Sequence, residues 1–320
     1  MRRFKLAIVG ATGLVGNTIL KIIDEENLLK YFDITLYVSA RSAGKVMMYK
    51  DRVYRFVELN ENALKLSFDF VLFSAGASVS KVFAEKFASN GAFVIDNTSA
   101  FRKMENIPLV VPEINANILN KNTKLISNPN CSTIELALVI DRLKILGNIQ
   151  KVVVSTYQSV SGAGRRALLD LKNNTKNVFK NGINNNLIAQ IGEIEDNRFS
   201  VEENKIMFEM SKILGKKLDV SASAIRVPTD ICHGESVYVK FENDVNLIDV
   251  FAALDCDYIK FNTDFIFELI DAKESNLTYV CRIRQKNKNE LEFFVIADNL
   301  RRGAAYNAVK IAKYIIDNII

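Results

Sequence analysis

Gly10-Ala11-Thr12-Gly13-Leu14-Val15-Gly16 is the stretch that decides the first half of the fold. It follows the apolar run Phe4–Val9, which predicts a buried strand, and it leads into Leu14–Glu26, which predicts a helix. Backbone N–H groups at a helix N-terminus carry partial positive charge, and glycines allow a pyrophosphate to approach closely. The stretch therefore predicts a dinucleotide loop, although G-x-x-G-x-x-G spacing also suits an ordinary strand–helix turn.

The same alternation of strand and helix continues through the first 130 residues. A helix is expected at Val79–Asn90, and further strands are expected at Ile34–Val38, Val53–Glu58, Phe68–Phe73 and Ala92–Ile95. Alternating elements of this kind indicate an α/β domain with a parallel, doubly wound sheet of the Rossmann type.

The pattern changes after residue 130. A long helix is expected from Cys131 to about Leu146, and a strong amphipathic helix at Arg302–Ile319. Strands are expected at Lys151–Val160, Ala222–Ile225, Val237–Phe241, Leu277–Arg284 and Leu291–Ala297. The last two flank the polar turn Gln285–Glu290, which is a hairpin signal. The second half therefore predicts an α+β domain with a mixed sheet.

Composition limits the functional classes. A chain of 320 residues can form two domains, and its net charge of +5 is scattered, which argues against nucleic-acid binding and allows an anionic ligand. The four cysteines form no C-x-x-C pair, so no metal site is expected, and sparse cysteines suit a reducing cytoplasm. Neither a signal peptide nor a membrane span is expected.

The segment after the second expected strand indicates which dinucleotide is bound. NAD-binding folds usually place a carboxylate there for the ribose 2′-hydroxyl. Here Ser39, Arg41 and Ser42 supply two hydroxyls and a guanidinium instead. These groups suit a 2′-phosphate and favour NADP, while an ordinary solvated loop remains the alternative.

Cys131 is the candidate nucleophile. It lies in the polar turn Ser127–Thr133, which follows a strand and opens a helix. The helix dipole at such a position stabilises a thiolate, so a lowered pKa is expected. The alternative is a purely structural cysteine. A thiolate nucleophile needs an acid/base partner, and His233 is the single histidine of the chain, so any Cys/His pair must join these two residues.

Together these residues resemble the bacterial type of aspartate-semialdehyde dehydrogenase. The resemblance covers nearly the whole chain. Seven segments carry it in the family's order: residues 10–16, 39–45, 96–102, 128–133, 157–164, 226–236 and 298–305.

The resemblance implies a reaction, a cofactor and an assembly. The reaction is the NADPH-dependent reductive dephosphorylation of L-4-aspartyl phosphate to L-aspartate 4-semialdehyde, which supplies lysine, methionine and threonine synthesis. Residues 1–130, completed by the helix at 300–320, would bind NADP. Residues 131–299 would carry catalysis and form a homodimer.

It also implies residue roles. Cys131 is the nucleophile, His233 the general acid/base, and Gln158 helps to hold the reacting group. Phosphate would be contacted by Arg102 and Asn130, joined by Lys205. The substrate ammonium would be contacted by Glu202 and its carboxylate by Arg226. Cofactor contacts fall to Gly10, Thr12, Gly13, Leu14, Val15, Gly16, Ser39, Arg41, Ser42, Ser161, Gly162 and Asn299.

Some residues allow other interpretations. Glu202 and Lys205 lie three apart, as a helical ion pair would, and Ser200 with Glu203 forms a capping-box pattern. Arg102 could be a surface residue. Relatives usually carry glycine where this chain has Cys232, and residues 181–198 match poorly.

Three rival functions remain. N-acetylglutamyl-phosphate reductase shares the fold and the thiolate but has no substrate ammonium for Glu202. A catalytically inactive NADP-binding relative should have lost Cys131 or His233. A thiol hydrolase has no use for the glycine loop or for Arg41.

Overall fold

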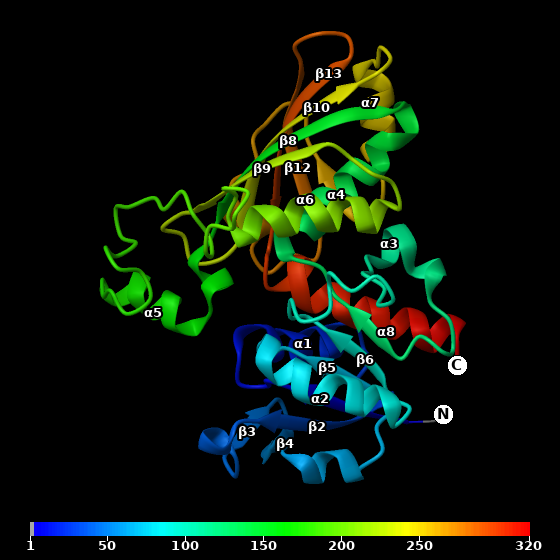
Figure 1. The fold of residues 1–320 in the computed structure, drawn as a ribbon, viewed down its shortest axis with the longest axis vertical. Coiled ribbons are helices and arrows are strands. Elements are labelled where there is room, and N and C mark those ends of the chain that lie inside the picture. The colour runs from blue at the N-terminus through cyan, green and yellow to red at the C-terminus, as the bar shows by residue number, and fades with distance from the viewer. Residues whose placement is uncertain (1–2) are drawn as a thin grey trace. The chain divides into compact units, whose positions relative to one another are not determined.

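The computed structural model describes residues 3–320 and divides into two compact units (Figure 1). Unit 1 comprises the chain up to Pro129 together with Ala304–Ile320, and unit 2 comprises Asn130–Gly303. The divisions expected from the sequence are at 130/131 and 299/300. Each unit has its own sheet.

Unit 1 is built on a seven-stranded sheet of order β3-β4-β2-β1-β5-β6-β7. The strands are β1 (Phe4–Val9), β2 (Phe32–Val38), β3 (Val46–Tyr49), β4 (Arg52–Glu58), β5 (Phe70–Phe73), β6 (Phe93–Asp96) and β7 (Leu125–Ser127). All neighbours are parallel except the edge pair β3–β4, which is antiparallel. The predicted doubly wound sheet is confirmed, with an antiparallel edge hairpin that the sequence did not indicate.

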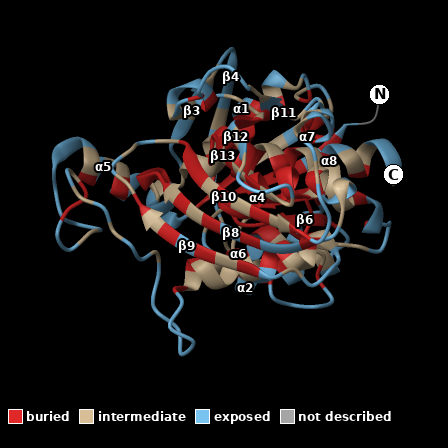
Figure 2. Cartoon of the chain, turned by 90° about the horizontal axis from the view of Figure 1, so that it is seen from above, coloured by how far each residue is buried: buried red, intermediate tan, exposed pale blue. Residues whose placement is uncertain are grey.

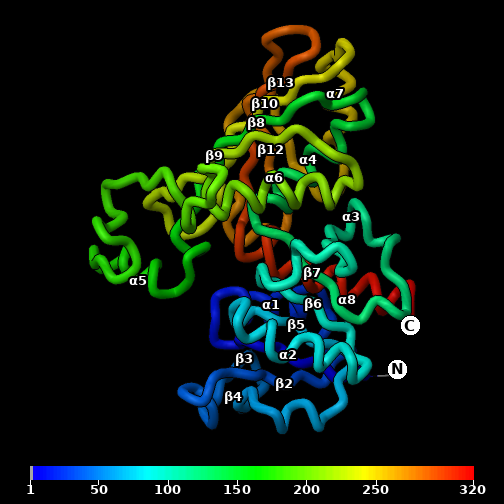
Figure 3. Tube along the Cα trace, viewed as in Figure 1, coloured from blue at the N-terminus to red at the C-terminus, as the bar shows by residue number. Residues whose placement is uncertain are grey.

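Helices cover both faces of this sheet. They are α1 (Leu14–Glu25), α2 (Ala77–Ser89), α3 (Pro112–Asn115) and α8 (Tyr306–Asn318). Leu6 and Ile8 pack with α1 and α8, while Ala7 and Val9 pack with α2, because successive strand residues point to opposite faces. The first helix and the last therefore lie together although almost the whole chain separates them (Figure 3).

Unit 2 is built on a six-stranded mixed sheet of order β11-β12-β13-β10-β8-β9. The strands are β8 (Ile149–Gln158), β9 (Val220–Arg226), β10 (His233–Phe241), β11 (Ile259–Phe261), β12 (Thr278–Gln285) and β13 (Glu290–Ala297). Burial alternates along the central strands, so one face of the sheet is packed and the other is more open (Figure 2).

The helices of unit 2 are α4 (Cys131–Leu143), α5 (Arg165–Asn173), α6 (Val201–Leu214) and α7 (Leu247–Leu254). The expected helix to about Leu146 ends at Leu143 and continues as a 3-10 turn. Likewise, α8 begins later than expected, because Arg301–Ala305 forms a π-helical turn before it. Within residues 3–320, no helix has both the length and the apolar character needed to cross a membrane.

The glycine loop is closely packed in its own right. Gly10 has a φ of 87°, and a Cβ there would lie 2.8 Å from the backbone carbon of Ser74. A Cβ on Gly16 would lie 2.4 Å from the carbonyl oxygen of Gly10. No side chain fits at either position, so the turn needs glycine whether or not a ligand is bound.

We expect Gly16→Ala to destabilise unit 1. Forcing a methyl group against backbone costs about 1–3 kcal/mol, and each kcal/mol lowers the Tm by about 2–4 °C in a domain of this size. Thermal unfolding should show a smaller loss for Gly13→Ala, whose Cβ would lie 3.1 Å from the same oxygen. Equal losses would contradict the steric argument.

Candidate active site

Strand register brings three of the predicted site residues to one end of the unit 2 sheet. His233, the first residue of β10, pairs with Gln158, the last of β8, and Gln158 pairs with Arg226, the last of β9. All three are buried. A row of this kind forms only because β8 and β10 run antiparallel while β8 and β9 run parallel.

Cys131 is the first residue of α4, and its Sγ lies 3.2 Å from Nε2 of His233. The residue before it, Asn130, caps the helix by accepting a hydrogen bond from the Thr133 amide. Asn130 is itself held by two carboxylates: its backbone N–H donates to Glu209 and its Nδ2 to Glu202, each at 2.7 Å. These bonds fix the backbone that carries the thiol.

Glu202 is buried near the start of α6, and its second oxygen forms an ion pair with Lys205 at 3.1 Å. Ser200 and Glu203 form the capping box that the sequence indicated. The helical ion pair and the cap are therefore both present. However, Glu202 does not lie on a solvated helix face, because it also accepts from Asn130.

Burial controls the charge of the Cys131–His233 pair. It raises the pKa of the Cys131 thiol, and the negative charges of Glu202 and Glu135 raise it further. The expectation of a lowered pKa at Cys131 is therefore wrong, because desolvation outweighs the local helix dipole. Burial and the charge of Arg226 lower the pKa of His233 to about 3. The resting pair is a neutral thiol beside a neutral imidazole.

The guanidinium of Arg226 is oriented by the loop that follows β8. Its Nη1 donates to the carbonyl oxygen of Ser159 at 2.7 Å. A Cβ on Gly162 would lie 2.9 Å from this nitrogen and 3.6 Å from the His233 ring. Glycine at this position therefore leaves room for both side chains.

Ser161 and Asn299 form a buried polar group behind the imidazole. Asn299 Nδ2 donates to Ser161 Oγ at 3.0 Å, and its Oδ1 accepts from the backbone N–H of Cys232 at the same distance. Cys232 has a φ of 72°, a conformation that glycine adopts more easily. This is the position where relatives were expected to carry glycine.

A cluster of buried ionisable side chains lies close to Cys131, and sequence reasoning missed it. Glu135, one helical turn after Cys131, is fully buried, as are Glu235 and Arg302. Burial raises the pKa of the Glu135 and Glu235 carboxyls well above the usual range of a glutamate. The negative charge of Glu235 raises the pKa of Glu135 further. The signal was the i, i+4 spacing from the cysteine, which places Glu135 on the same helix face.

Some of the predicted cofactor residues of unit 1 line a pocket of about 510 Å³. Its lining includes Gly10, Thr12, Gly13 and Ser39. Leu14, Val15 and Gly16 continue into α1. Arg41 and Ser42 lie in the 3-10 turn Ala40–Ser42 directly after this lining, and Arg41 is exposed. This arrangement fits a dinucleotide, since glycine backbone and hydroxyls face the pocket and no carboxylate lines it.

Arg102 also belongs to unit 1. It is buried, and its Nη2 donates to the carbonyl oxygen of Asn97 at 2.8 Å. The alternative of a plain surface arginine is therefore wrong.

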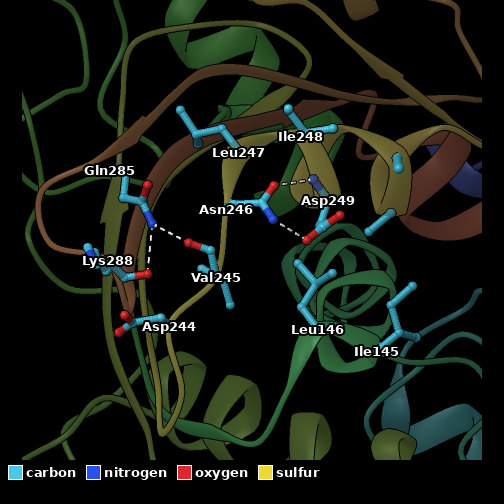
Figure 4. A pocket seen from close by; sticks show the side chains of 12 residues that line it. Ile145, Leu146, Asp244, Val245, Asn246, Leu247, Ile248, Asp249, Gln285 and Lys288 are labelled. Atoms are coloured by element: carbon cyan, nitrogen blue, oxygen red, sulfur yellow. Dashed lines mark hydrogen bonds between the residues drawn. The ribbon is translucent and has the colours of Figure 1, made fainter.

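A wider hollow of about 1230 Å³ lies at the opposite end of the unit 2 sheet (Figure 4). Its polar groups are largely engaged by the chain itself. Asn246 caps α7 by accepting from the Asp249 amide, and Gln285 donates to the carbonyl oxygens of Val245 and Lys288. None of the predicted site residues lines it. Among residues 3–320, no group of three or more His, Cys, Asp or Glu side chains could hold a metal ion.

Two family models match the chain. One describes the NAD-binding domain of semialdehyde dehydrogenases and matches residues 5–122, and the other describes their dimerisation domain and matches residues 142–302. The chain belongs to the semialdehyde dehydrogenase family. This membership confirms the resemblance and the two-part fold that the sequence indicated.

Named relatives specify the branch of the family. The chain is similar to aspartate-semialdehyde dehydrogenase of Aquifex aeolicus, with 38% identity over 98% of both chains. It is 36% identical to that of Bacillus subtilis, over 98% of this chain and 97% of the relative. The crystal structure of aspartate semialdehyde dehydrogenase II from Vibrio cholerae, complexed with ASA, matches with a TM-score of 0.95 and 33% identity over all of both chains.

We expect Glu135→Gln to stabilise the protein, and the gain in stability should increase as pH rises. A carboxyl whose folded pKa lies above its unfolded value contributes stability below the unfolded pKa, and this contribution is lost as pH rises through the folded pKa. Glutamine has no such loss. The difference in Tm between variant and wild type should therefore grow from pH 5 to pH 8.

Glu242→Gln, which changes an exposed carboxyl of the same unit, provides the control. A Tm difference for Glu135→Gln that stays constant with pH would show that the buried carboxyl keeps its usual pKa.

Proposed function

We propose that Cys131, His233 and Gln158 carry the family reaction in this chain, the NADPH-dependent reductive dephosphorylation of L-4-aspartyl phosphate to L-aspartate 4-semialdehyde. The chain is an aspartate-semialdehyde dehydrogenase by its relatives. The observation that supports these three residues is the 3.2 Å approach of Cys131 Sγ to the single imidazole, in a row with Gln158 and Arg226.

The chemistry starts from a neutral pair. Sγ of Cys131 attacks the acyl carbon as His233 takes the thiol proton at Nε2. The carbon–oxygen bond to phosphate breaks, and phosphate leaves with that proton. NADPH, when bound, supplies a hydride that reduces the resulting thioester. The thiohemiacetal alkoxide then collapses to the aldehyde, the carbon–sulfur bond breaks, and Cys131 leaves as thiolate.

Substrate orientation falls to the charged groups around this pair. Arg226 presents a fixed fork for the carboxylate. Glu202 would bind the ammonium, and Asn130 and Lys205 would bind phosphate. Since the last two both contact Glu202, the ammonium and phosphate subsites would be neighbours. Arg102 of unit 1 is proposed as a further phosphate contact.

Glu202 also bears on the rival reductase. Its buried carboxylate suits a substrate with a free ammonium and gives no benefit to an N-acylated one. An inactive relative is not favoured either, because Cys131 and His233 are both present and in contact.

For the cofactor we propose NADP, held by the loop Gly10–Gly16 and by the 2′-phosphate contacts Ser39, Arg41 and Ser42. The unit 1 pocket supports this proposal through its glycine and hydroxyl lining. Ser161, Gly162 and Asn299 are proposed for the nicotinamide end. A cytoplasmic homodimer is the proposed working form, supported by the match to the dimerisation domain.

The activity is tested by phosphate-dependent NADPH formation from L-aspartate 4-semialdehyde. We expect Cys131→Ala to lower the rate by about a thousandfold or more, since covalent catalysis is lost. Cys256→Ala, which changes another partly exposed thiol of unit 2, should keep the rate. Preference for N-acetylglutamate semialdehyde, or a tenth of the rate in Cys131→Ala, would overturn the proposal.

Arg41→Ala tests the cofactor assignment. A charge-assisted hydrogen bond contributes about 1.5–3 kcal/mol, so NADP binding should weaken about ten- to a hundredfold. NAD binding should change little, because NAD has no 2′-phosphate. Calorimetric titration with both cofactors checks this expectation, and equal weakening would contradict it.

A further inference from the structure

The imidazole of His233 has different partners at its two nitrogens. Nε2 faces the reacting sulfur at 3.2 Å. Nδ1 faces two groups of Ser159, the backbone N–H at 3.1 Å and the hydroxyl at 3.2 Å. The proposed proton transfer uses only Nε2. The hydrogen bonds at Nδ1, however, determine whether Nε2 is free to accept a proton.

The Ser159 N–H can only donate, so by itself it requires a bare Nδ1. A neutral ring with a bare Nδ1 carries its proton on Nε2. Such a ring cannot take the thiol proton at Nε2, because that nitrogen is already protonated. Both forms that serve proton transfer, the imidazolium and the neutral Nδ1–H tautomer, need an acceptor beside Nδ1.

The Ser159 hydroxyl is the side chain that provides this acceptor. A hydroxyl can donate to a bare nitrogen or accept from a protonated one by rotation. Its own hydrogen then needs a partner, and Asn299 Oδ1 lies 3.2 Å away, with Ser161 Oγ at 2.9 Å. The Cys232 N–H, which donates to Asn299 Oδ1, fixes this end of the amide as an acceptor.

We propose that Ser159 is a positioning residue for proton transfer, whose hydroxyl accepts the Nδ1 proton of His233 and donates in turn to Asn299. This chain of two hydrogen bonds, from Nδ1–H to Ser159 Oγ and from Ser159 to Asn299 Oδ1, stabilises the protonated ring while Cys131 is a thiolate. When Nδ1 carries no proton, the hydroxyl donates to Nδ1 or to Ser161 instead. This inference deepens the proposed function and rests on it.

The surroundings explain why the ring needs such help. His233, Ser159, Ser161 and Asn299 are all buried, so no bulk water solvates the imidazolium. The charge of Arg226 opposes protonation, while the charge of Glu202 and the Cys232 backbone favour it. A hydrogen bond formed only by the protonated ring therefore counts for more here than it would in water.

The experiment measures Cys131 itself and needs no substrate. The rate of Cys131 alkylation by iodoacetamide, followed by peptide mass spectrometry, is recorded against pH for wild type, Ser159→Ala and Ser159→Thr. Below the thiol pKa, alkylation proceeds through the thiolate–imidazolium form. Loss of the hydroxyl should therefore lower the alkylation rate in that pH range by about two- to tenfold, the contribution of one hydrogen bond. Ser159→Thr, which keeps the hydroxyl, should restore the wild-type profile.

Ser80→Ala is the matched control, because Ser80 is an equally buried serine of unit 1 that donates to Asp96. It should lower Tm without moving the alkylation profile. A Ser159→Ala profile that matches wild type would overturn the proposal and leave Ser159 with a structural role.

A second measurement needs no variant. Since the chain has one histidine, nitrogen NMR of untagged protein labelled at histidine reports this ring alone. In the neutral ring that receives the thiol proton at Nε2, Nδ1 should already be protonated. A ring that keeps a bare Nδ1 across the whole alkylation profile overturns the proposal. Either result stands apart from the assay with aspartate semialdehyde, so a failure here and a failure of the proposed function are distinguishable.

Discussion

The register between β8 and β10 is the constraint on which the site depends. Because side chains alternate along a strand, a slip of one residue would turn His233 to the other face of the sheet and away from Cys131. The same register sets Gln158 beside His233. The pairing of His233 with Ala297 on β13 brings Asn299 to the same end two residues later. His233, its neighbours and the hydroxyls behind it are therefore positioned by one set of backbone hydrogen bonds.

Burial of Cys131 and His233 disfavours the charged forms of both side chains. The thiol and the imidazole are both neutral at rest, because an ion pair would have to form in a desolvated site. In the proposed mechanism, however, the fixed charges of Arg226 and Glu202 are already in place, so they need no rearrangement when charge develops during attack. A neutral pair that ionises only as the reaction proceeds also limits alkylation and oxidation of the resting thiol, since the thiolate is the reactive form.

Sequence patterns predicted the long, periodic elements well, because strand and helix periods are local properties. They missed the short elements β3, β11, α3, α5 and α7. They also placed the start of α8 too early, because a π-helical turn precedes it. Cys131 and His233 could be found from the sequence, since one lies in a polar turn and the other has no competitor. The pKa of Cys131 could not be predicted, because its burial depends on segments that are distant in the sequence. No spacing rule reveals that Glu235 and Arg302 lie nearby.

Cys232 shows how backbone and site chemistry are joined. A left-handed conformation costs a residue other than glycine about 1–2 kcal/mol. The thiol of Cys232 offsets part of that cost by packing in an apolar cluster with Cys281 and Phe267. In this conformation its N–H donates to Asn299 Oδ1, which fixes the amide so that an oxygen faces the Ser159 hydroxyl. The strained turn just before the histidine thus determines where the Ser159 hydroxyl can donate its hydrogen.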